Sequence, residues 1–236
     1  MTKTSAPRVS TGKRVKTDKP TNVHLVVDRS GSMGHIRGAV IEGLNDYLTQ
    51  LEGEHVRISL TTFDTVYEHP IRDRHIAEFP IISEDMYVPR GGTALYDAVA
   101  HAITETESAI EPDEKVLIVV MTDGQENSSK EYQGEAGRLA LQKLIKRYEK
   151  KGWAFSYLGA NVDAKLEAQA IGIPAANAVY YSASAGSVSR ASGVLSGATL
   201  NYAKGATGAM GPAGVRGSIF AEGENTDLRD ENLVGV

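Results

Sequence analysis

The residues best suited to chemistry follow the first apolar segment of the chain. Asp28-Arg29-Ser30-Gly31-Ser32 comes directly after the apolar run at residues 23–27. Alternate residues of an extended segment share a side, so the carboxylate of Asp28 and the hydroxyls of Ser30 and Ser32 can point to one place. Such oxygen atoms suit Mg²⁺, which binds them at about 2.1 Å in near-octahedral geometry and keeps several waters. The pattern indicates a site for a hard metal ion.

Two further segments offer the same kind of oxygen. Thr93 follows the pair Gly91-Gly92 at the start of a helical pattern, and Asp123 follows the apolar run at residues 116–121. The two glycines allow a tight turn through which the Thr93 hydroxyl can reach a metal ion. Because the first pattern alone is short enough to occur by chance, the prediction depends on the three segments together.

Jointly, the three segments resemble the loops of the von Willebrand factor type A (vWA) domain family, which carries a metal-ion-dependent adhesion site (MIDAS). All five ligand positions match the family pattern, and the resemblance covers roughly residues 20–182. It implies an intracellular type of vWA domain with a complete MIDAS, in which the serine and threonine hydroxyls bind the metal directly. The carboxylates would bind it mostly through waters. The implied metal ligands are Asp28, Ser30, Ser32, Thr93 and Asp123.

Alternating strand and helix patterns must position these loops. Apolar runs predict strands at residues 23–27, 56–63, 116–121, 153–158 and 178–181, with a return strand near 65–67 and an irregular segment at 69–92. Apolar residues at helical spacing predict helices near 36–51, 94–109, 134–151, 164–171 and 184–203. This order predicts an α/β fold with an open, mostly parallel central sheet and helices on both faces, a Rossmann-like arrangement. Ligands bind at the carboxyl ends of the strands in such sheets.

Three parts are expected along the 236 residues: a disordered basic leader at 1–20, a vWA domain at 21–204, and a flexible Gly-rich and acidic tail at 205–236. The leader holds six basic residues and one acidic residue, without a hydrophobic period. Glycine then recurs at every third position from Gly205 to Gly217, a run too short for a collagen triple helix.

Composition narrows the possible partners. A formal charge of −5 argues against general nucleic-acid binding. The chain has no cysteine, which excludes disulfides and thiol chemistry and, without clustered histidines, disfavours zinc. The leader lacks the apolar region of a signal peptide, and the apolar run at residues 116–121 is too short to cross a bilayer. We therefore expect no membrane association and a cytoplasmic location, in a cell or in a cell infected by a virus that encodes the protein.

The resemblance implies a function in protein binding, in which an Asp or Glu of a protein partner completes the coordination of a bound Mg²⁺, or of Mn²⁺ or Ca²⁺. We expect no enzymatic activity, because the sequence contains no phosphate-binding loop, no Gly-x-Ser-x-Gly motif and no evident catalytic base. Two alternatives stay open. One is a structural or assembly protein of a larger complex or viral particle, and the other is a metal-dependent phosphoesterase.

Several residues near the predicted site are not expected to bind the metal directly. Arg29 and His35 flank the ligands and are expected to be exposed residues of the rim, which Asp64 could also join. Asp97 lies one helical turn after the Thr93 loop and could cap backbone groups, join the outer shell of the metal, or be a plain surface residue. His24, within the first strand, is expected to be a hydrogen-bonded core or sheet-edge histidine.

Overall fold

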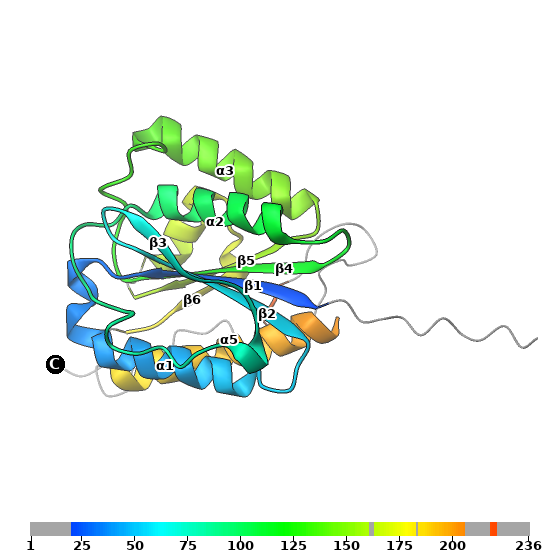
Figure 1. The fold of residues 1–236 in the computed structure, drawn as a ribbon. Coiled ribbons are helices and arrows are strands. Elements are labelled where there is room, and N and C mark those ends of the chain that lie inside the picture. Colours follow the sequence, from blue (N-terminus) through cyan, green and yellow to red (C-terminus); the bar gives the residue numbers. More distant parts are fainter. Residues whose placement is uncertain (1–19, 161–162, 183, 206–217, 221–236) are drawn as a thin grey trace, which may run out of the picture.

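A six-stranded sheet forms the centre of the computed structural model, which describes residues 20–160, 163–182, 184–205 and 218–220 (Figure 1). Its strands lie in the order β3-β2-β1-β4-β5-β6, and all neighbours pair in parallel except β2 and β3. The strands are β1 (Thr21–Asp28), β2 (Val56–Phe63), β3 (Tyr67–His75), β4 (Lys115–Thr122), β5 (Ala154–Gly159) and β6 (Ala178–Tyr180). The predicted α/β class and mostly parallel sheet are confirmed.

Helices cover both faces of this sheet. They are α1 (Arg37–Gln50), α2 (Leu95–Ala109), α3 (Gly134–Lys150), α4 (Ala164–Ile171) and α5 (Ala185–Lys204), with the short 3-10 helices η1 (Gly31–Ile36), η2 (Ile76–Glu78) and η3 (Ala175–Asn177). In Figure 1, α1 and α5 lie below the sheet, and α2 and α3 lie above it. The apolar residues of α4 pack in the same layer as those of α2 and α3.

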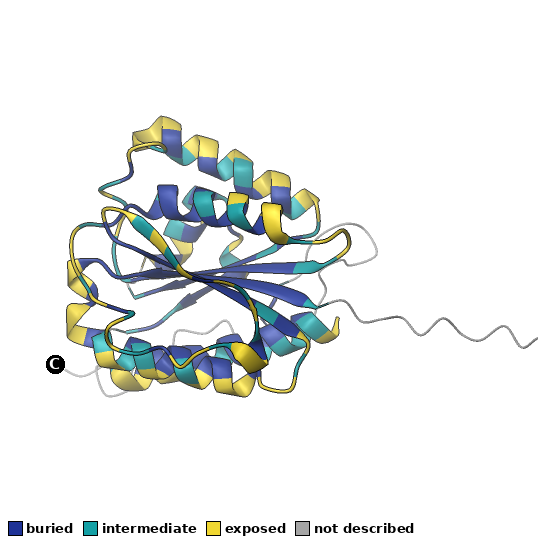
Figure 2. Cartoon of the chain, viewed as in Figure 1, coloured by how far each residue is buried: buried dark blue, intermediate teal, exposed yellow. Residues whose placement is uncertain are grey.

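The burial pattern explains why the central strands are apolar at every position. Leu117 and Val119 of β4 enter the layer with α1 and α5, whereas Ile118 and Val120 enter the layer with α2 and α3. Successive side chains of a strand point to opposite faces, so a strand between two helical layers has no solvent-facing position. Figure 2 shows the result, a dark buried sheet between helices whose outer surfaces are exposed.

The edge strand β3 differs from the prediction. Residues 69–92 were predicted to be irregular, and this is wrong for β3, which runs antiparallel to β2 as far as His75. Pro70 cannot donate to a ladder, but an edge strand leaves one side of its backbone unpaired and can therefore accept proline. The register shifts twice along the β2–β3 pairing, and the exposed Arg72 and Arg74 lie on this strand, features that discourage pairing with another chain.

Strand order reverses at β1, which pairs with β2 on one side and β4 on the other. The connection that leaves β1 leads to α1 below the sheet, and the connection that leaves β4 leads to α3 above it. Two loops therefore diverge from adjacent strand ends, which is where open α/β sheets bind ligands. Asp28 ends β1 and Asp123 directly follows β4.

A short part of the predicted tail lies on the domain. Ile219 and Phe220 are buried in the layer with α1 and α5, and Ile219 N donates to Asn177 Oδ1 at 3.0 Å. Ser218 Oγ donates to the carbonyl of Ala176 at 2.6 Å. The predicted leader, up to residue 19, and the remainder of the predicted tail, at 206–217 and 221–236, lie outside the described residues.

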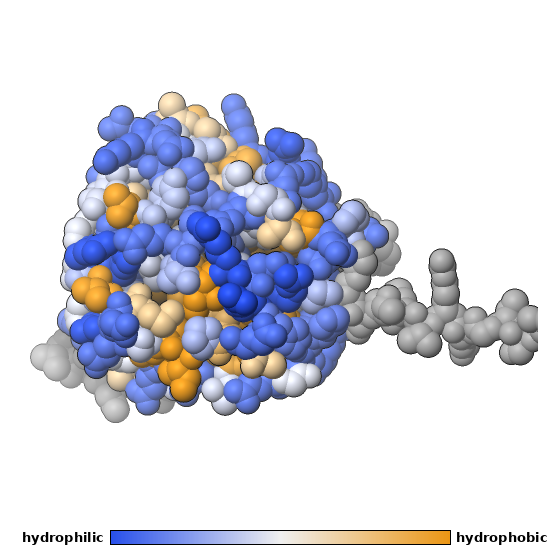
Figure 3. Space-filling model, in the orientation of Figure 1, coloured by the Kyte–Doolittle hydropathy of each residue, from blue (hydrophilic) through white to orange (hydrophobic). Residues whose placement is uncertain are grey.

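The surface seen in Figure 3 is mainly hydrophilic, with apolar side chains gathered near its centre and lower edge. Ile81, in the segment between η2 and α2, is 80% exposed and lines a shallow hollow with Leu48 and Phe79. None of the helices within the described part of the chain has the length and apolar character needed to cross a membrane.

Candidate functional site

The predicted ligands come together at the carboxyl ends of β1 and β4. Ser32 Oγ donates a hydrogen bond to Asp123 Oδ1 at 2.7 Å and lies 3.1 Å from Ser30 Oγ. A β-carbon built on Gly124 would lie 3.4 Å from Thr93 Oγ1 and 3.9 Å from Ser32 Oγ. The Thr93 and Ser32 hydroxyls therefore both lie beside Gly124, the residue that follows Asp123.

Asp28 lies beneath this group and is fully buried. Its Oδ1 accepts a hydrogen bond from Ser30 N at 2.6 Å, and its Oδ2 accepts one from Thr122 Oγ1 at 2.6 Å. Burial raises the pKa of Asp28 to about 6, the charge of Asp123 adds to this, and the hydrogen bonds from Thr122 and Ser30 oppose it. With both oxygens bonded, Asp28 orients the turn that carries the two serines.

The spacing of the oxygen atoms fits a small hard cation. Two ligands at right angles on an ion with bonds of about 2.1 Å stand about 3 Å apart, close to the Ser30–Ser32 and Ser32–Asp123 separations. Within the described residues, no three or more His, Cys, Asp or Glu side chains group in a way that could hold a metal ion. A site here would thus depend on hydroxyl oxygens, which suit Mg²⁺, Mn²⁺ or Ca²⁺.

Asn127 holds the Thr93 loop from one side. Its Oδ1 accepts a hydrogen bond from Thr93 N at 2.9 Å, and its backbone N–H donates to Thr93 O at 3.0 Å. A β-carbon on Gly92 would lie 2.7 Å from the same Oδ1 and 2.3 Å from Ser128 Oγ, so only glycine fits there without displacing them. Asn127 was not predicted from the sequence, because a polar residue in a loop is usually just solvated.

Two carboxylates order the rest of the loop that leaves β4. Asp97 accepts hydrogen bonds from Lys130 N at 2.7 Å and Tyr132 N at 2.8 Å, so it is buried and caps backbone groups, one of the readings left open above. Glu126 accepts hydrogen bonds from Ser129 N at 2.7 Å and Tyr96 N at 3.0 Å. Both side chains tie this loop to the start of α2.

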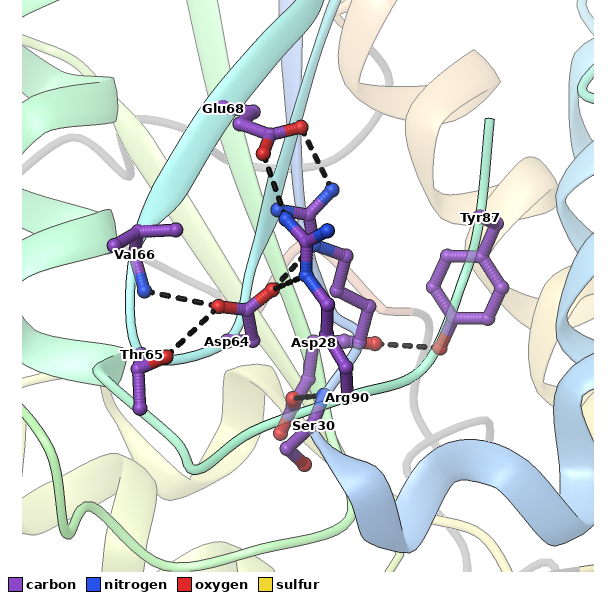
Figure 4. Close-up of polar contacts among 9 residues, drawn as sticks. Asp28, Ser30, Asp64, Thr65, Val66, Glu68, Tyr87 and Arg90 are labelled. Carbon is purple, nitrogen blue, oxygen red and sulfur yellow. Dashed lines mark hydrogen bonds and ion pairs between the residues drawn. The ribbon is translucent and has the colours of Figure 1, made fainter. Parts of the chain in front are cut away.

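A cluster of two arginines and two carboxylates borders the other side of the site (Figure 4). Asp64 Oδ2 lies 2.9 Å from the Nε atoms of both Arg29 and Arg90, and Glu68 lies 2.8 Å from each guanidinium group. We call these four residues the arginine–carboxylate cluster. Arg29 is 5% exposed, so its prediction as an exposed rim residue is wrong. The buried Asp64 neutralises its charge; His35, by contrast, is exposed as predicted.

Backbone hydrogen bonds join the same segments. Arg90 N donates to Arg29 O at 2.8 Å, and Gly31 N donates to Gly91 O at 3.1 Å. Gly91 has a φ of +65° and lies against residues 64–65, a conformation and a closeness that favour glycine. Ala94 N donates to Asp64 O at 2.7 Å, which connects the cluster to the residue after Thr93. The loop of the two serines and the Thr93 loop are therefore held together at several points.

His24 is a core residue, as predicted. It is 1% exposed, with Nδ1 2.7 Å from Thr106 Oγ1 and Nε2 2.7 Å from Thr61 Oγ1. Burial, with a smaller contribution from His69, lowers the pKa of His24 to about 3. The ring is neutral at physiological pH and links β1 to α2 and β2.

The similarity to known proteins concerns the fold and does not establish the function. No protein-family model and no curated protein sequence matches the chain. Among solved structures, the pilus adhesin SpaC from Lactobacillus rhamnosus GG matches with a TM-score of 0.60 and 18% identity, covering 80% of this chain and 30% of that one. The von Willebrand factor type A protein from Catenulispora acidiphila matches with a TM-score of 0.59 and 14% identity, covering 78% and 43%.

A third neighbour is the manganese-loaded TRAP protein of Plasmodium vivax, with a TM-score of 0.52 and 16% identity, covering 70% of this chain and 69% of that one. The chain thus spans less than half the length of the adhesin and of the Catenulispora protein. At such identities the likeness concerns the fold and not the function. The chain has a vWA-like α/β fold.

Proposed function

We propose that this protein is a metal-ion-dependent binding module, in which Ser30, Ser32 and Thr93 bind a divalent cation directly. Asp28 and Asp123 complete the site, mostly through waters. The cation is Mg²⁺, with Mn²⁺ or Ca²⁺ as possible substitutes. The partner is a protein that offers an Asp or Glu side chain, in the manner that the vWA resemblance implies.

One observation carries the proposal: oxygen atoms of Ser30, Ser32 and Asp123 meet at the carboxyl ends of β1 and β4 at spacings that suit one small cation, and the Thr93 hydroxyl of a third loop lies on the same side, beside Gly124. In the described part of the chain the residues around them form no histidine or cysteine cluster, and the neighbouring arginines are neutralised by carboxylates. The manganese-loaded TRAP structure gives the same fold a metal-bound example.

The chain's own residues prepare the site for an acidic ligand. The direct protein ligands are neutral hydroxyls, so a bound cation keeps its affinity for an incoming carboxylate. Arg29 and Arg90 are held by Asp64 and Glu68 and do not compete for that carboxylate. We further propose that the module acts in the cytoplasm and has no enzymatic activity.

Metal binding is the first test. Titration of the purified protein with Mn²⁺, followed by electron paramagnetic resonance of the free ion, should show one site that Mg²⁺ competes for. Asp123→Asn and Ser32→Ala should weaken it at least tenfold, whereas Ser83→Ala, a serine outside the three ligand loops, should not. Equal Mn²⁺ affinity in all four proteins would refute the assignment of these ligands.

Partner binding is the second test. Immobilised protein should capture an acidic partner in Mg²⁺ and release it in EDTA, and Asp28→Ala should abolish this capture while far-ultraviolet circular dichroism stays unchanged. A partner that Asp28→Ala retains equally well, with or without the chelator, would contradict a metal-bridged mode of binding.

A further inference from the structure

Ile81 projects from a segment that is held firmly against α1. Its side chain is 80% exposed, more than any other large apolar side chain in the described part of the chain, whereas Ile82 is 2% exposed. Ile82 N donates to Asn45 Oδ1 at 2.9 Å, and Asn45 Nδ2 donates to Ile82 O at 3.0 Å. Arg37 Nε donates to the carbonyl of Tyr87 at 3.0 Å, further along the same segment. The exposure of Ile81 is therefore fixed by its neighbours, and a partner that covers it has little disorder to remove.

A hollow of about 180 Å³ lies beside Ile81. The last turns of α1 and the segment after η2 line it, with Leu48, Phe79 and Pro80 as apolar walls. By volume it holds about six waters, enough for one isoleucine side chain. The surface thus carries a projecting apolar side chain and a hollow of matching size next to each other.

A projection beside a hollow suits a second copy of the same chain. In a dimer with twofold symmetry both copies use the same surface, so each feature of one copy must fit a feature of the other. When the twofold axis passes between Ile81 and the hollow, each Ile81 enters the hollow of the other copy. A partner of another kind would have to supply both features independently.

The charges around the hollow suit the same arrangement. Glu52 lines it, and a second hollow, which meets the first at Pro80, is lined by Arg74 and Glu78. All three charged side chains are exposed, and none of them has an ion-pair partner within the described residues. The surface therefore carries unpaired charges of both signs. A twofold axis near Pro80 brings Arg74 of one copy toward Glu52 of the other, and opposite charges that meet in this way fix the register of an interface.

We propose that this surface is the interface of a twofold homodimer. Each Ile81 packs against Leu48 and Phe79 of the other copy, and each Arg74 pairs with Glu52 of the other copy. Side chains make the contact and no strands pair, so the features of β3 that discourage strand pairing do not oppose it. The hollow lies along the last turns of α1, which begins close to the candidate metal site, so both metal sites stay open in the dimer. The inference does not depend on the proposed function.

The test is sedimentation velocity of the purified protein in EDTA, because chelation removes any association through bound metal. The chain of 25.3 kDa should sediment as a dimer at about 100 μM and dissociate on dilution. Ile81→Ser should raise the dissociation constant of the dimer roughly hundredfold, because the substitution acts twice in a twofold interface. The matched control is Leu166→Ser, which removes a leucine that is 66% exposed on α4, on the other face of the sheet. It should leave the dimer unchanged.

Charge reversal tests how the two copies are arranged. Arg74→Glu and Glu52→Arg should each weaken the dimer roughly tenfold, because each places like charges together at two points of the interface. The double variant with both substitutions should bring the dissociation constant back close to that of the unchanged protein. Circular dichroism checks that each variant is folded.

A protein that stays monomeric at about 100 μM would overturn the proposal in favour of a different protein as the occupant of this surface. A dimer that Ile81→Ser and Leu166→Ser weaken equally would also overturn it. A double variant that dimerises no better than the single charge reversals would refute the twofold arrangement.

Discussion

The substitution Asp64→Asn should destabilise the protein more than Glu68→Gln, because Asp64 is the buried carboxylate of the arginine–carboxylate cluster and Glu68 is the more exposed one. The Asp64 side chain is 2% exposed and contacts both Arg29 and Arg90, whereas Glu68 is 52% exposed and contacts the same two residues. Asparagine has a single side-chain oxygen, so when this oxygen accepts from Val66 N, the two Nε–H donors face an amide NH2 group, which cannot accept their hydrogen bonds.

The expected magnitude follows from burial. Removing one partner of a buried ion pair costs about 3–5 kcal/mol, because the other charge stays buried and unpaired. Asp64→Asn would leave Arg29 buried with only the half-exposed Glu68 as its partner, since Arg29 is 5% exposed and its Nη2 already lacks a hydrogen-bond partner among the described residues. Exposed pairs contribute about 1 kcal/mol or less, so Glu68→Gln should have a small effect. A domain with about 5–15 kcal/mol of stability would survive either change.

Urea denaturation measures the difference directly. The chain has one tryptophan, Trp153, and it is 4% exposed, so its fluorescence reports global unfolding. We expect Asp64→Asn to lower the free energy of unfolding by at least 2 kcal/mol more than Glu68→Gln and to weaken Mn²⁺ binding in the folded protein. Equal effects of the two variants, or a loss below about 1 kcal/mol for Asp64→Asn, would refute the idea that this carboxylate holds the ligand loops together.

Three further predictions follow from burial and close contact. Asp28 has a pKa of about 6, so its carboxylate is mostly protonated at pH 5, and the affinity for Mn²⁺ should fall about tenfold between pH 7.5 and pH 5. A constant affinity would contradict the role of Asp28 in the site. His24, with a pKa of about 3 in the fold against 6.5 when unfolded, should make the protein about 2.5 kcal/mol less stable at pH 4.5 than at pH 7, a loss absent from His24→Asn in denaturant titrations. Gly92→Ala should displace Asn127 and weaken metal binding by isothermal calorimetry, whereas Gly193→Ala, with open space around its β-carbon on α5, should bind normally and be slightly more stable.

The sequence was informative where each predicted ligand lies in a short segment with a pattern of its own. Asp28, Ser30 and Ser32 lie within five residues after an apolar strand, and the structure places them where that order predicts. Thr93 and Asp123 are far apart in sequence, yet each follows a turn or strand pattern of its own. The sheet itself was predictable for the same reason, because strands buried on both faces are apolar throughout.

The features that the sequence could not predict depend on contacts between residues that lie far apart in the chain and meet only in the fold. Arg29 looked exposed because a charged residue beside a ligand has no local sign of burial, and its partner Asp64 is 35 residues away. Asn127 is 34 residues away from Thr93, whose backbone N–H donates a hydrogen bond to the Asn127 side chain. Edge strand β3 was hidden by Pro70 and its charges, since an edge position tolerates both.

These long-range contacts also bear on how the site would respond to a ligand. The Thr93 loop is held by Asn127 on one side and, through Ala94 and Arg90, by Asp64 on the other. Each neutral hydroxyl binds a cation only weakly. The affinity of the site therefore depends on the protein holding these hydroxyls in position before the cation binds. If the two supports act together, loosening both should weaken metal binding by more than the sum of the single effects. A double-mutant cycle of Asp64→Asn and Asn127→Ala, read by Mn²⁺ affinity, measures that coupling, and strictly additive losses would show that the two supports act independently.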